Sequence, residues 1–189
     1  MVKLGFICEG ETEKTIVESE KFKSLLSNLN LELVGAIDAT GGGNQLPKNI
    51  LPFHNALIGL NAEKIFILTD REKDPCITEV KNRIENNLGH QIIVSVEAIE
   101  SWYLADDVTL SAIFRKNFHC DSPESTPSKP FDYLRSELNK SGIQGLSSSK
   151  IKFTKRMLQY GFDVANAAVH PECKSAKYFL NKLKEASQQ

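Results

Sequence analysis

The sequence lacks the features that assign many proteins to a class at first sight. Its four cysteines stand singly, without a CxxC or Cys/His ligand spacing, so neither a disulfide framework nor a zinc finger is expected. No apolar run approaches the ~20 residues that a helix needs to cross a bilayer. Gly41–Gly43 is followed by neither the lysine nor the spacing of a nucleotide-binding loop, which leaves it as a loop or turn.

Signals for export and for several kinds of catalysis are also missing. The first apolar stretch is short and ends in acidic residues, unlike a secretory signal peptide, so we expect a cytoplasmic protein that does not act at a membrane. No serine or cysteine stands in a nucleophile motif. The histidines have no partners at metal-ligand or triad spacing; they are His54, His90, His119 and His170.

Charge is nearly balanced over the chain, with 23 basic and 24 acidic residues, but it is distributed unevenly. Residues 1–114 carry 10 lysines and arginines against 17 acids, whereas residues 115–189 carry 13 against 7. An acidic half beside a basic half suits a metal-dependent protein that acts on a polyanion, because acids hold the cation and bases hold phosphates. Chance variation between the two parts is the alternative.

Strand and helix patterns alternate through the first hundred residues. Apolar segments predict strands over residues 2–8, 31–37, 64–69 and 91–96. Helical periodicity predicts helices over 13–29, with Thr12 as the N-cap, and over 49–60, 77–88 and 98–114. Four strand–helix units predict an α/β fold with a mostly parallel sheet and helices on both faces.

The pattern becomes helical after Phe114. A loop rich in serine and proline is expected over residues 121–130. Helices are expected over 131–139, 150–160, 164–169 and 175–186. We therefore expect two parts, an α/β domain over residues 1–118 and a helical C-terminal region over residues 119–189 that packs on or next to it.

Acidic segments follow three of the predicted strands, where parallel sheets form their ligand sites. Glu9 follows the first strand, Asp70 and Glu72 follow the third, and Glu97 and Glu100 follow the fourth. Carboxylates that converge there would raise one another's pKa values, and a shared divalent cation would remove that cost. For each segment taken alone, an ordinary turn with solvated charges remains the alternative.

These motifs resemble the Toprim fold, which topoisomerases, primases and nucleases of the overcoming-lysogenization-defect type share. The resemblance rests on a Glu-Gly at the end of the first strand and an Asp-x-acid motif at the end of the third. The chain also resembles short Toprim-like proteins of bacteria and archaea. Their Glu-Gly-x-Thr-Glu motif is matched by Glu9–Glu13, and their Ile-Glu-x-Trp-x-Leu-Ala-Asp motif by Ile99–Asp106. The resemblance covers residues 1 to about 115.

The resemblance implies a role for each acid. Toprim enzymes use a glutamate as general acid/base and an Asp-x-Asp pair to hold magnesium, which implies catalysis by Glu9 and metal binding by Asp70. Glu72 stands where the second aspartate is expected, and Asp74 is the alternative. In the motif of the shorter proteins, Glu100 is a further candidate catalytic carboxylate that faces the site. The implied cofactor is Mg²⁺ or Mn²⁺.

A basic run lies in one of the predicted C-terminal helices. Lys152, Lys155 and Arg156 are candidates for contacts with nucleic-acid phosphates, which give affinity without sequence preference. A solvated helix face is the alternative for this run.

Taken together, these features predict a metal-dependent phosphodiester hydrolase, a nuclease acting on DNA or RNA. The resemblance to the shorter proteins implies a role in repair or in phage defence beside an ATPase partner, although the chain has no ATPase motif of its own. Two alternatives stay open. One is a non-catalytic module with a Toprim fold that binds nucleic acid or a protein partner, and the other is nucleotidyl transfer, as in primases.

Overall fold

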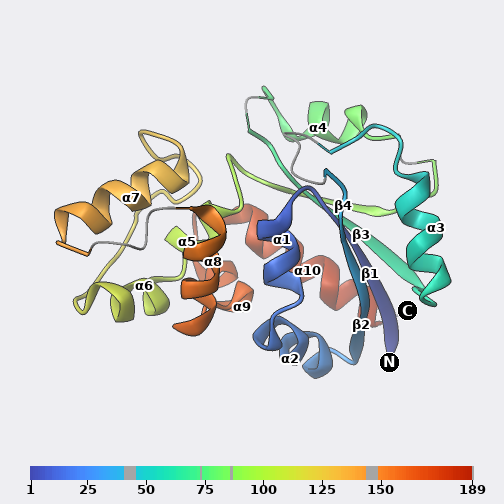
Figure 1. Cartoon of the computed structure of the whole chain (residues 1–189), viewed down its shortest axis with the longest axis horizontal. Helices are drawn as coiled ribbons and strands as arrows, with labels where there is room; N and C mark the ends of the chain where they lie inside the picture. Colours follow the sequence, from blue (N-terminus) through green and yellow to red (C-terminus); the bar gives the residue numbers. More distant parts are fainter. Residues whose placement is uncertain (41–45, 73, 86, 144–148, 189) are drawn as a thin grey trace.

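A four-stranded parallel sheet with helices on both faces forms the centre of the molecule, and further helices lie beside it (Figure 1). The computed structural model describes residues 1–40, 46–72, 74–85, 87–143 and 149–188. The prediction of an α/β fold built on a parallel sheet is confirmed. The glycine loop predicted at Gly41–Gly43 lies outside the described residues.

The order of the strands creates a switch point in the sheet. The strands are β1 (Val2–Cys8), β2 (Leu31–Asp38), β3 (Lys64–Asp70) and β4 (Gln91–Ser95), and they lie in the order β2-β1-β3-β4. The chain leaves β1 toward β2 and later crosses back past β1 to reach β3. Ligands bind outside the carboxyl ends of strands whose connections run to opposite sides. The topology therefore marks the ends of β1 and β3.

Both faces of the sheet are buried, because side chains alternate between two apolar clusters. Phe6 and Phe66 face one layer of helices, whereas Ile7 and Ile67 face the other. A sheet covered on both sides needs strands that are apolar along their whole length. This requirement explains why the four strand segments could be recognised in the sequence.

The first face is covered by α1 (Glu11–Val17), α2 (Glu20–Asn28) and α10 (Lys174–Ser187). The prediction of one helix over 13–29 with Thr12 as N-cap is wrong. Gly10 is the N-cap of α1, and Ser19 interrupts the helix by accepting a hydrogen bond from the Phe22 amide at 3.2 Å, which caps α2. The interruption lets both short helices turn apolar side chains into the same core.

Two glycines bring α3 (Leu51–Gly59) close to the second face. Gly5 and Gly35 are register partners on β1 and β2. A β-carbon on Gly5 would lie 3.0 Å from Leu57, and one on Gly35 would lie 2.7 Å from Leu60. Larger residues at these two positions would therefore push the helix away from the sheet.

The second helix on this face, α4 (Ile77–Arg83), is shorter than the predicted helix over 77–88. Ile84 already has an extended backbone, and the Glu85 amide donates a hydrogen bond to the Lys48 carbonyl at 3.0 Å. Pairing with the segment before α3 thus replaces the last helical turn. Leu88, which was expected on the apolar face of the helix, is exposed.

The predicted helix over 98–114 is also divided, into α5 (Glu100–Leu104) and α6 (Asp107–Phe114). Asp106 causes the division because its carboxylate accepts hydrogen bonds from the Thr109 amide at 3.0 Å and hydroxyl at 2.9 Å. Trp102 is fully buried and stacks on Phe179 of α10.

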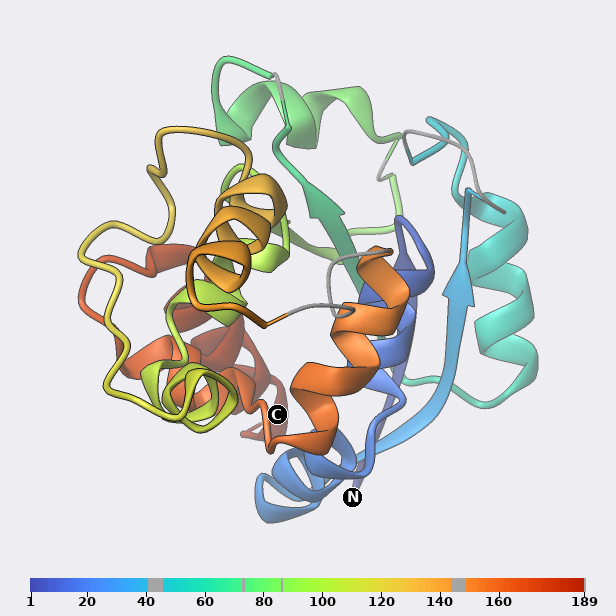
Figure 2. The same ribbon diagram turned by 60° about the vertical axis from the view of Figure 1, so that its left-hand side comes forward.

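The remaining helices agree closely with the sequence prediction. They are α7 (Pro130–Lys140), α8 (Lys150–Gln159) and α9 (Val164–Val169). Figure 2 shows α8, in orange, alongside α1, with which it is in contact. α10 shares one apolar cluster with the sheet, so residues from both halves of the chain form the same core. Within the described residues, no helix is both long and apolar enough to cross a membrane.

Candidate functional site

Glu9 and Asp70 meet at the switch point between β1 and β3. Glu9 follows the last residue of β1, and its backbone amide donates to the Leu68 carbonyl at 2.9 Å, which extends the pairing with β3. The Glu9 Oε2 atom accepts hydrogen bonds from the Asp70 amide at 2.8 Å and from the Thr69 hydroxyl. Glu9 is 8% exposed and Asp70 9% exposed, so two carboxylates lie together in a largely buried position.

The Asp70 side chain is held by the end of β4 and the turn that follows it. Its Oδ1 atom accepts hydrogen bonds from the Ile99 amide at 2.9 Å and from the Ser95 hydroxyl. These bonds fix the carboxylate of β3 against the segment that leads into α5. The arrangement is rigid before any ligand arrives, which is what a binding site requires.

Glu13 is a third buried acid at this edge of the sheet. It lies in the first turn of α1, and its Oε2 atom accepts a hydrogen bond from the Gly10 amide at 3.0 Å. A β-carbon on Gly10 would lie 3.3 Å from that same oxygen, so glycine leaves room for the side chain to fold back. The Glu-Gly-x-Thr-Glu motif is therefore the local signal for two buried carboxylates, Glu9 and Glu13.

Glu100, the first residue of α5, is 1% exposed and paired with a distant lysine. Lys150, at the start of α8, places its Nζ atom 2.9 Å from Glu100 Oε1. The Glu100 Oε2 atom is buried and has no hydrogen-bond partner among the described residues. Lys150 thus brings one positive charge to a site that contains four acids, Glu9, Glu13, Asp70 and Glu100.

The carboxylates act on one another, as their pKa values indicate. Burial, followed by the charges of Glu13 and Glu100, raises the pKa of Asp70 well above its ordinary value. Burial, followed by the charges of Glu100 and Glu9, raises the pKa of Glu13 to about 7. Burial also raises the pKa of Glu9, although its hydrogen bonds to Thr69 and Asp70 oppose the shift. The site therefore concentrates negative charge beyond what its own residues neutralise.

Lys150 compensates part of this charge. Burial alone would lower its pKa, but the charges of Glu100, Asp70 and Glu13 outweigh burial and raise it. The lysine is therefore charged at neutral pH and supplies one positive charge to the site.

Glu72 and Asp74, the other predicted metal ligands, lie at the margin of the cluster. Glu72 is exposed, although its charge still acts on Glu9. Its backbone is left-handed, with φ 47°, as is that of Glu97, with φ 63°, and the Glu72 amide donates to the Glu97 carbonyl at 2.9 Å. Asp74 is instead paired with Arg83, 2.8 Å away, so the structure does not bring it to the cluster.

A small cavity of about 140 Å³ opens beside the acids. Glu72, Glu97, Glu100 and Lys150 line it from one side, and Phe131 lines it from α7. Glu97 is also paired with Arg71. The flat, apolar ring of Phe131 therefore lies next to charged groups. This combination suits a ligand with two parts: a planar or sugar-like part that packs on the ring, and a charged part that binds the acids through a cation.

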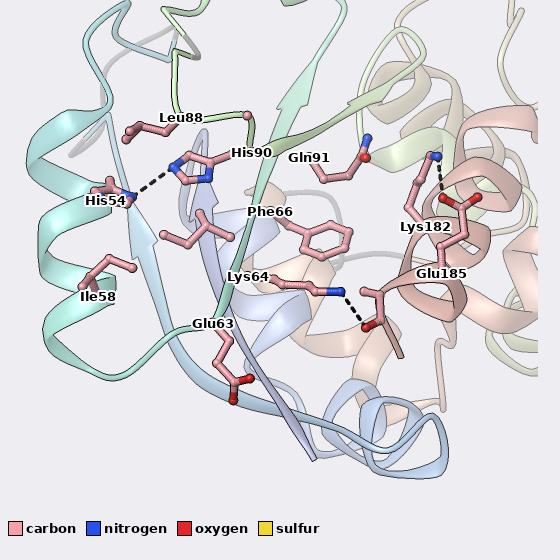
Figure 3. A pocket seen from close by; sticks show the side chains of 13 residues that line it. His54, Ile58, Glu63, Lys64, Phe66, Leu88, His90, Gln91, Lys182 and Glu185 are labelled. Atoms are coloured by element: carbon pink, nitrogen blue, oxygen red, sulfur yellow. Dashed lines mark hydrogen bonds and ion pairs between the residues drawn. The ribbon is translucent and has the colours of Figure 1, made fainter. Parts of the chain in front are cut away.

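A larger cavity, of about 460 Å³, lies at the opposite edge of the sheet, by the amino ends of β3 and β4. Figure 3 shows His54 next to His90 at one side of it and Lys182 beside Glu185 at another. The histidine nitrogens are 3.1 Å apart, and the Lys182–Glu185 ion pair is 2.6 Å long. Lys182 and Glu185 are paired and lie near the surface, so the size of this cavity alone does not favour it over the acidic edge.

The predicted phosphate contacts lie on α8. Lys152 and Lys155 are exposed, and Arg156 donates a hydrogen bond to the Tyr160 hydroxyl at 3.0 Å. Helical spacing puts Lys155 on the side opposite Phe153, which is buried, whereas Arg156 is half-buried nearer the Phe153 side. The same helix therefore directs Lys150 to the acids and Lys152 and Lys155 outward.

Comparison with protein-family models, with curated proteins and with solved structures found no match for this chain. The function must therefore be argued from the site itself. Sequence reasoning placed Glu9, Asp70 and Glu100 there and missed Glu13 and Lys150. Glu13 had a visible signal in its motif, whereas Lys150 had only its membership of a basic run.

Proposed function

We propose that the chain is a divalent-metal-dependent phosphodiester hydrolase with a Toprim-like site, acting on DNA or RNA. The observation that carries the proposal is the convergence of four buried acids, Glu9, Glu13, Asp70 and Glu100, at a switch point of a parallel sheet. Perturbed carboxylates grouped in this way are typical of functional sites, although structural ion pairs also produce them.

The residues fit Mg²⁺ or Mn²⁺ as the cofactor. Every donor is an oxygen, which these hard cations prefer. The Glu100 Oε2 atom is buried without a hydrogen-bond partner among the described residues, and a cation would satisfy it. Asp70 and Glu100 would hold the ion, with Glu72 at the margin. A bound dication would polarise the phosphate and stabilise its developing negative charge.

Glu9 is positioned to move a proton. Its two hydrogen bonds both end on Oε2, which leaves Oε1 to exchange a proton with water or with a leaving oxygen. Burial raises the pKa of Glu9 above its ordinary value, the direction that suits a carboxyl group that moves protons. Lys150 holds Glu100 in place and offers a positive charge next to an incoming phosphate.

Nucleic acid is the polyanion that the surroundings suit best. Lys152 and Lys155 are exposed on α8, whose first residue, Lys150, reaches the acids. The phosphate backbone of a nucleic acid that lies across α8 would contact these lysines on its way to the acidic site. We expect the contacts to be independent of sequence and sensitive to salt. A role in repair or phage defence beside an ATPase partner remains part of the proposal.

The experiment is a cleavage assay with the purified chain, using single- and double-stranded DNA and RNA with Mg²⁺ or Mn²⁺. Glu9→Gln and Asp70→Asn remove charge and keep shape, and each is expected to reduce the rate by about 100-fold or more. Glu11→Gln is the matched control, because Glu11 belongs to the same motif and is exposed. Cleavage that survives both variants would come from a contaminant and would contradict the proposal.

A non-catalytic binding module is the second candidate. Lys150 neutralises Glu100 without any metal, and Asp74 is occupied by Arg83, so part of the predicted metal set serves the fold. This candidate predicts salt-dependent binding of oligonucleotides without cleavage. Alanine at Lys152 and Lys155 would weaken that binding, whereas Asp70→Asn would leave it unchanged.

A further inference from the structure

Three potential metal ligands from distant parts of the chain meet outside the acidic site. Asp107 is the first residue of α6, His119 lies in the segment after that helix, and His170 is the C-cap of α9. One carboxylate oxygen and one nitrogen from each ring all lie within 4.8 Å of one another. These histidines have no metal-ligand spacing in the sequence, because the fold alone brings them together.

The surrounding structure holds this cluster in place. Asp106, fully buried beside it, accepts hydrogen bonds from the Asp163 amide at 3.1 Å and from Asn166 at 3.4 Å. These bonds join the start of α6 to the start of α9. The backbone that carries Asp107 is therefore tied to α9, whereas the His119 side chain is exposed.

Two buried atoms of the cluster lack hydrogen bonds. Asp107 Oδ1 and His170 Nε2 are both buried, and neither has a partner among the described residues. His170 is 6% exposed, so water does not readily replace the missing partner. A buried polar atom without a partner is costly, and a ligand bound at this place would satisfy both atoms.

We propose that Asp107, His119 and His170 bind a first-row transition-metal dication of the zinc class. Two imidazoles and one carboxylate favour Zn²⁺, Co²⁺ or Ni²⁺ over Mg²⁺. His119 Nδ1 is hydrogen-bonded to Asp107 Oδ2 at 2.6 Å, and Nε2 of the same ring lies 3.3 Å from Asp121 Oδ1, so a metal bound between His119 Nδ1 and Asp107 would replace the proton that they share. Asp121 is exposed and supplies a further oxygen beside the three ligands.

Metal binding through His170 Nε2 has one local cost. His170 Nδ1 accepts a hydrogen bond from the Glu172 amide at 3.2 Å, which places the proton of the neutral ring on Nε2. Coordination moves that proton to Nδ1 and breaks this bond. The loss of one hydrogen bond is small beside the binding free energy of a structural zinc site, so it does not prevent binding.

The metal would fasten the segment between α6 and α7 to α9. Glu124 of this segment accepts a hydrogen bond from the Ser175 amide at 2.8 Å, and Lys129 lines the small cavity beside Glu100. The role we assign is therefore structural, and it does not depend on hydrolysis at the acidic edge.

The test is titration of Zn²⁺ and Co²⁺ into the metal-free full chain in the presence of excess Mg²⁺. Calorimetry should give one equivalent bound, and Co²⁺ should develop the visible absorption of a site with nitrogen ligands. His119→Ala is expected to weaken binding by about 100-fold or more, and because His119 is exposed the substitution should leave the fold intact. Asp107→Asn keeps the shape and should weaken binding in the same direction.

Two controls separate this site from the others. His54→Ala removes a histidine from the pair at the opposite edge of the sheet and should leave Zn²⁺ binding unchanged. Asp70→Asn should also leave it unchanged, so failure at one site is distinguishable from failure at the other. The proposal is overturned if the wild type binds neither ion, or if His119→Ala binds both as tightly as the wild type does.

Discussion

The two edges of the sheet differ in how deeply their charged side chains are buried. At the carboxyl edge, four acids are buried around one lysine, next to a cavity of about 140 Å³. At the amino edge, a cavity of about 460 Å³ is lined by exposed or half-buried charges, among them the Lys182–Glu185 ion pair. The carboxyl edge is the better candidate site because four buried acids there share the positive charge of Lys150, and the size of the other cavity indicates only space.

The edges also differ in the direction of their pH dependence. A buried acid with a raised pKa, such as Glu13, keeps its proton in the folded state and destabilises the fold as pH rises. A half-buried histidine with a lowered pKa, such as His90, resists protonation and destabilises the fold as pH falls. Variants at the two edges should therefore change stability in opposite pH ranges.

Glu13→Gln is expected to have the largest effect, a gain in unfolding free energy on the order of 3 kcal/mol at pH 8 without metal. The pKa of Glu13 is raised from 4.5 to about 7, so its stabilising contribution is complete below 4.5 and lost as pH rises through about 7. Glutamine still accepts the hydrogen bond from Gly10. Urea unfolding in chelator at pH 5, 6, 7 and 8 measures the difference.

Glu11→Gln is the control for this measurement, because it removes an exposed acid two residues away. Its stability should run parallel to that of the wild type at every pH. A Glu13→Gln variant that gains nothing between pH 5 and pH 8 would show that burial and the neighbouring acids do not raise the pKa of Glu13.

Lys150→Met is expected to lower stability by about 2 kcal/mol in metal-free solution. The substitution leaves Glu100, which is 1% exposed, without its ion pair. Breaking a fully buried pair costs more, but the Lys150 side chain is 52% exposed and solvent screens part of the interaction. Thermal unfolding with and without Mg²⁺ tests this, since the cation should restore part of the loss.

Lys182→Met makes the corresponding change at the amino edge. The partner of Lys182, Glu185, is exposed, and water replaces the ion pair. No measurable loss of stability is expected there. Equal losses in the two lysine variants would remove the distinction between the edges.

The sequence predicted those parts of the site that follow strands. Glu9 and Asp70 come directly at strand ends, and the carboxyl ends of parallel strands meet at one edge. Glu100 was found because it follows the fourth strand within a recognisable motif. The four strands themselves were predicted almost to the residue, since a sheet buried on both faces needs continuous apolar segments.

Contacts between distant segments could not be predicted in this way. Lys150 is fifty positions from Glu100, and nothing in its helix distinguishes it from the outward-facing Lys152. Asp74 follows the same strand as Asp70 and Glu72, and nothing in the sequence shows that it pairs with Arg83. The predicted helix ends were wrong for a related reason. A single capping side chain, such as that of Asp106, ends one helix and begins another even where the helical pattern of the sequence continues.

His90→Asn should produce a smaller change, in the acidic range. Burial, and then the neighbouring His54, lowers the pKa of His90 from 6.5. The stability that depends on the neutral ring is present above 6.5 and lost as pH falls through the lowered pKa. The variant should therefore lose less stability than the wild type between pH 7 and pH 5. A steeper loss in the variant would contradict the assignment.

Glu72→Gly should have the smallest effect, a gain in stability of about 0.5 kcal/mol. Glycine adopts the left-handed backbone of this position without strain, which stabilises the folded state, but it also increases the entropy of the unfolded chain, which offsets part of the gain. Asn61→Gly, near the amino edge with φ 63°, should gain less, since asparagine tolerates this conformation. Glu72→Gln removes the charge and leaves the backbone as it is. If both Glu72 variants weaken Mg²⁺ binding equally in calorimetry, the carboxylate is a ligand. If neither does, Asp70 and Glu100 hold the cation without it.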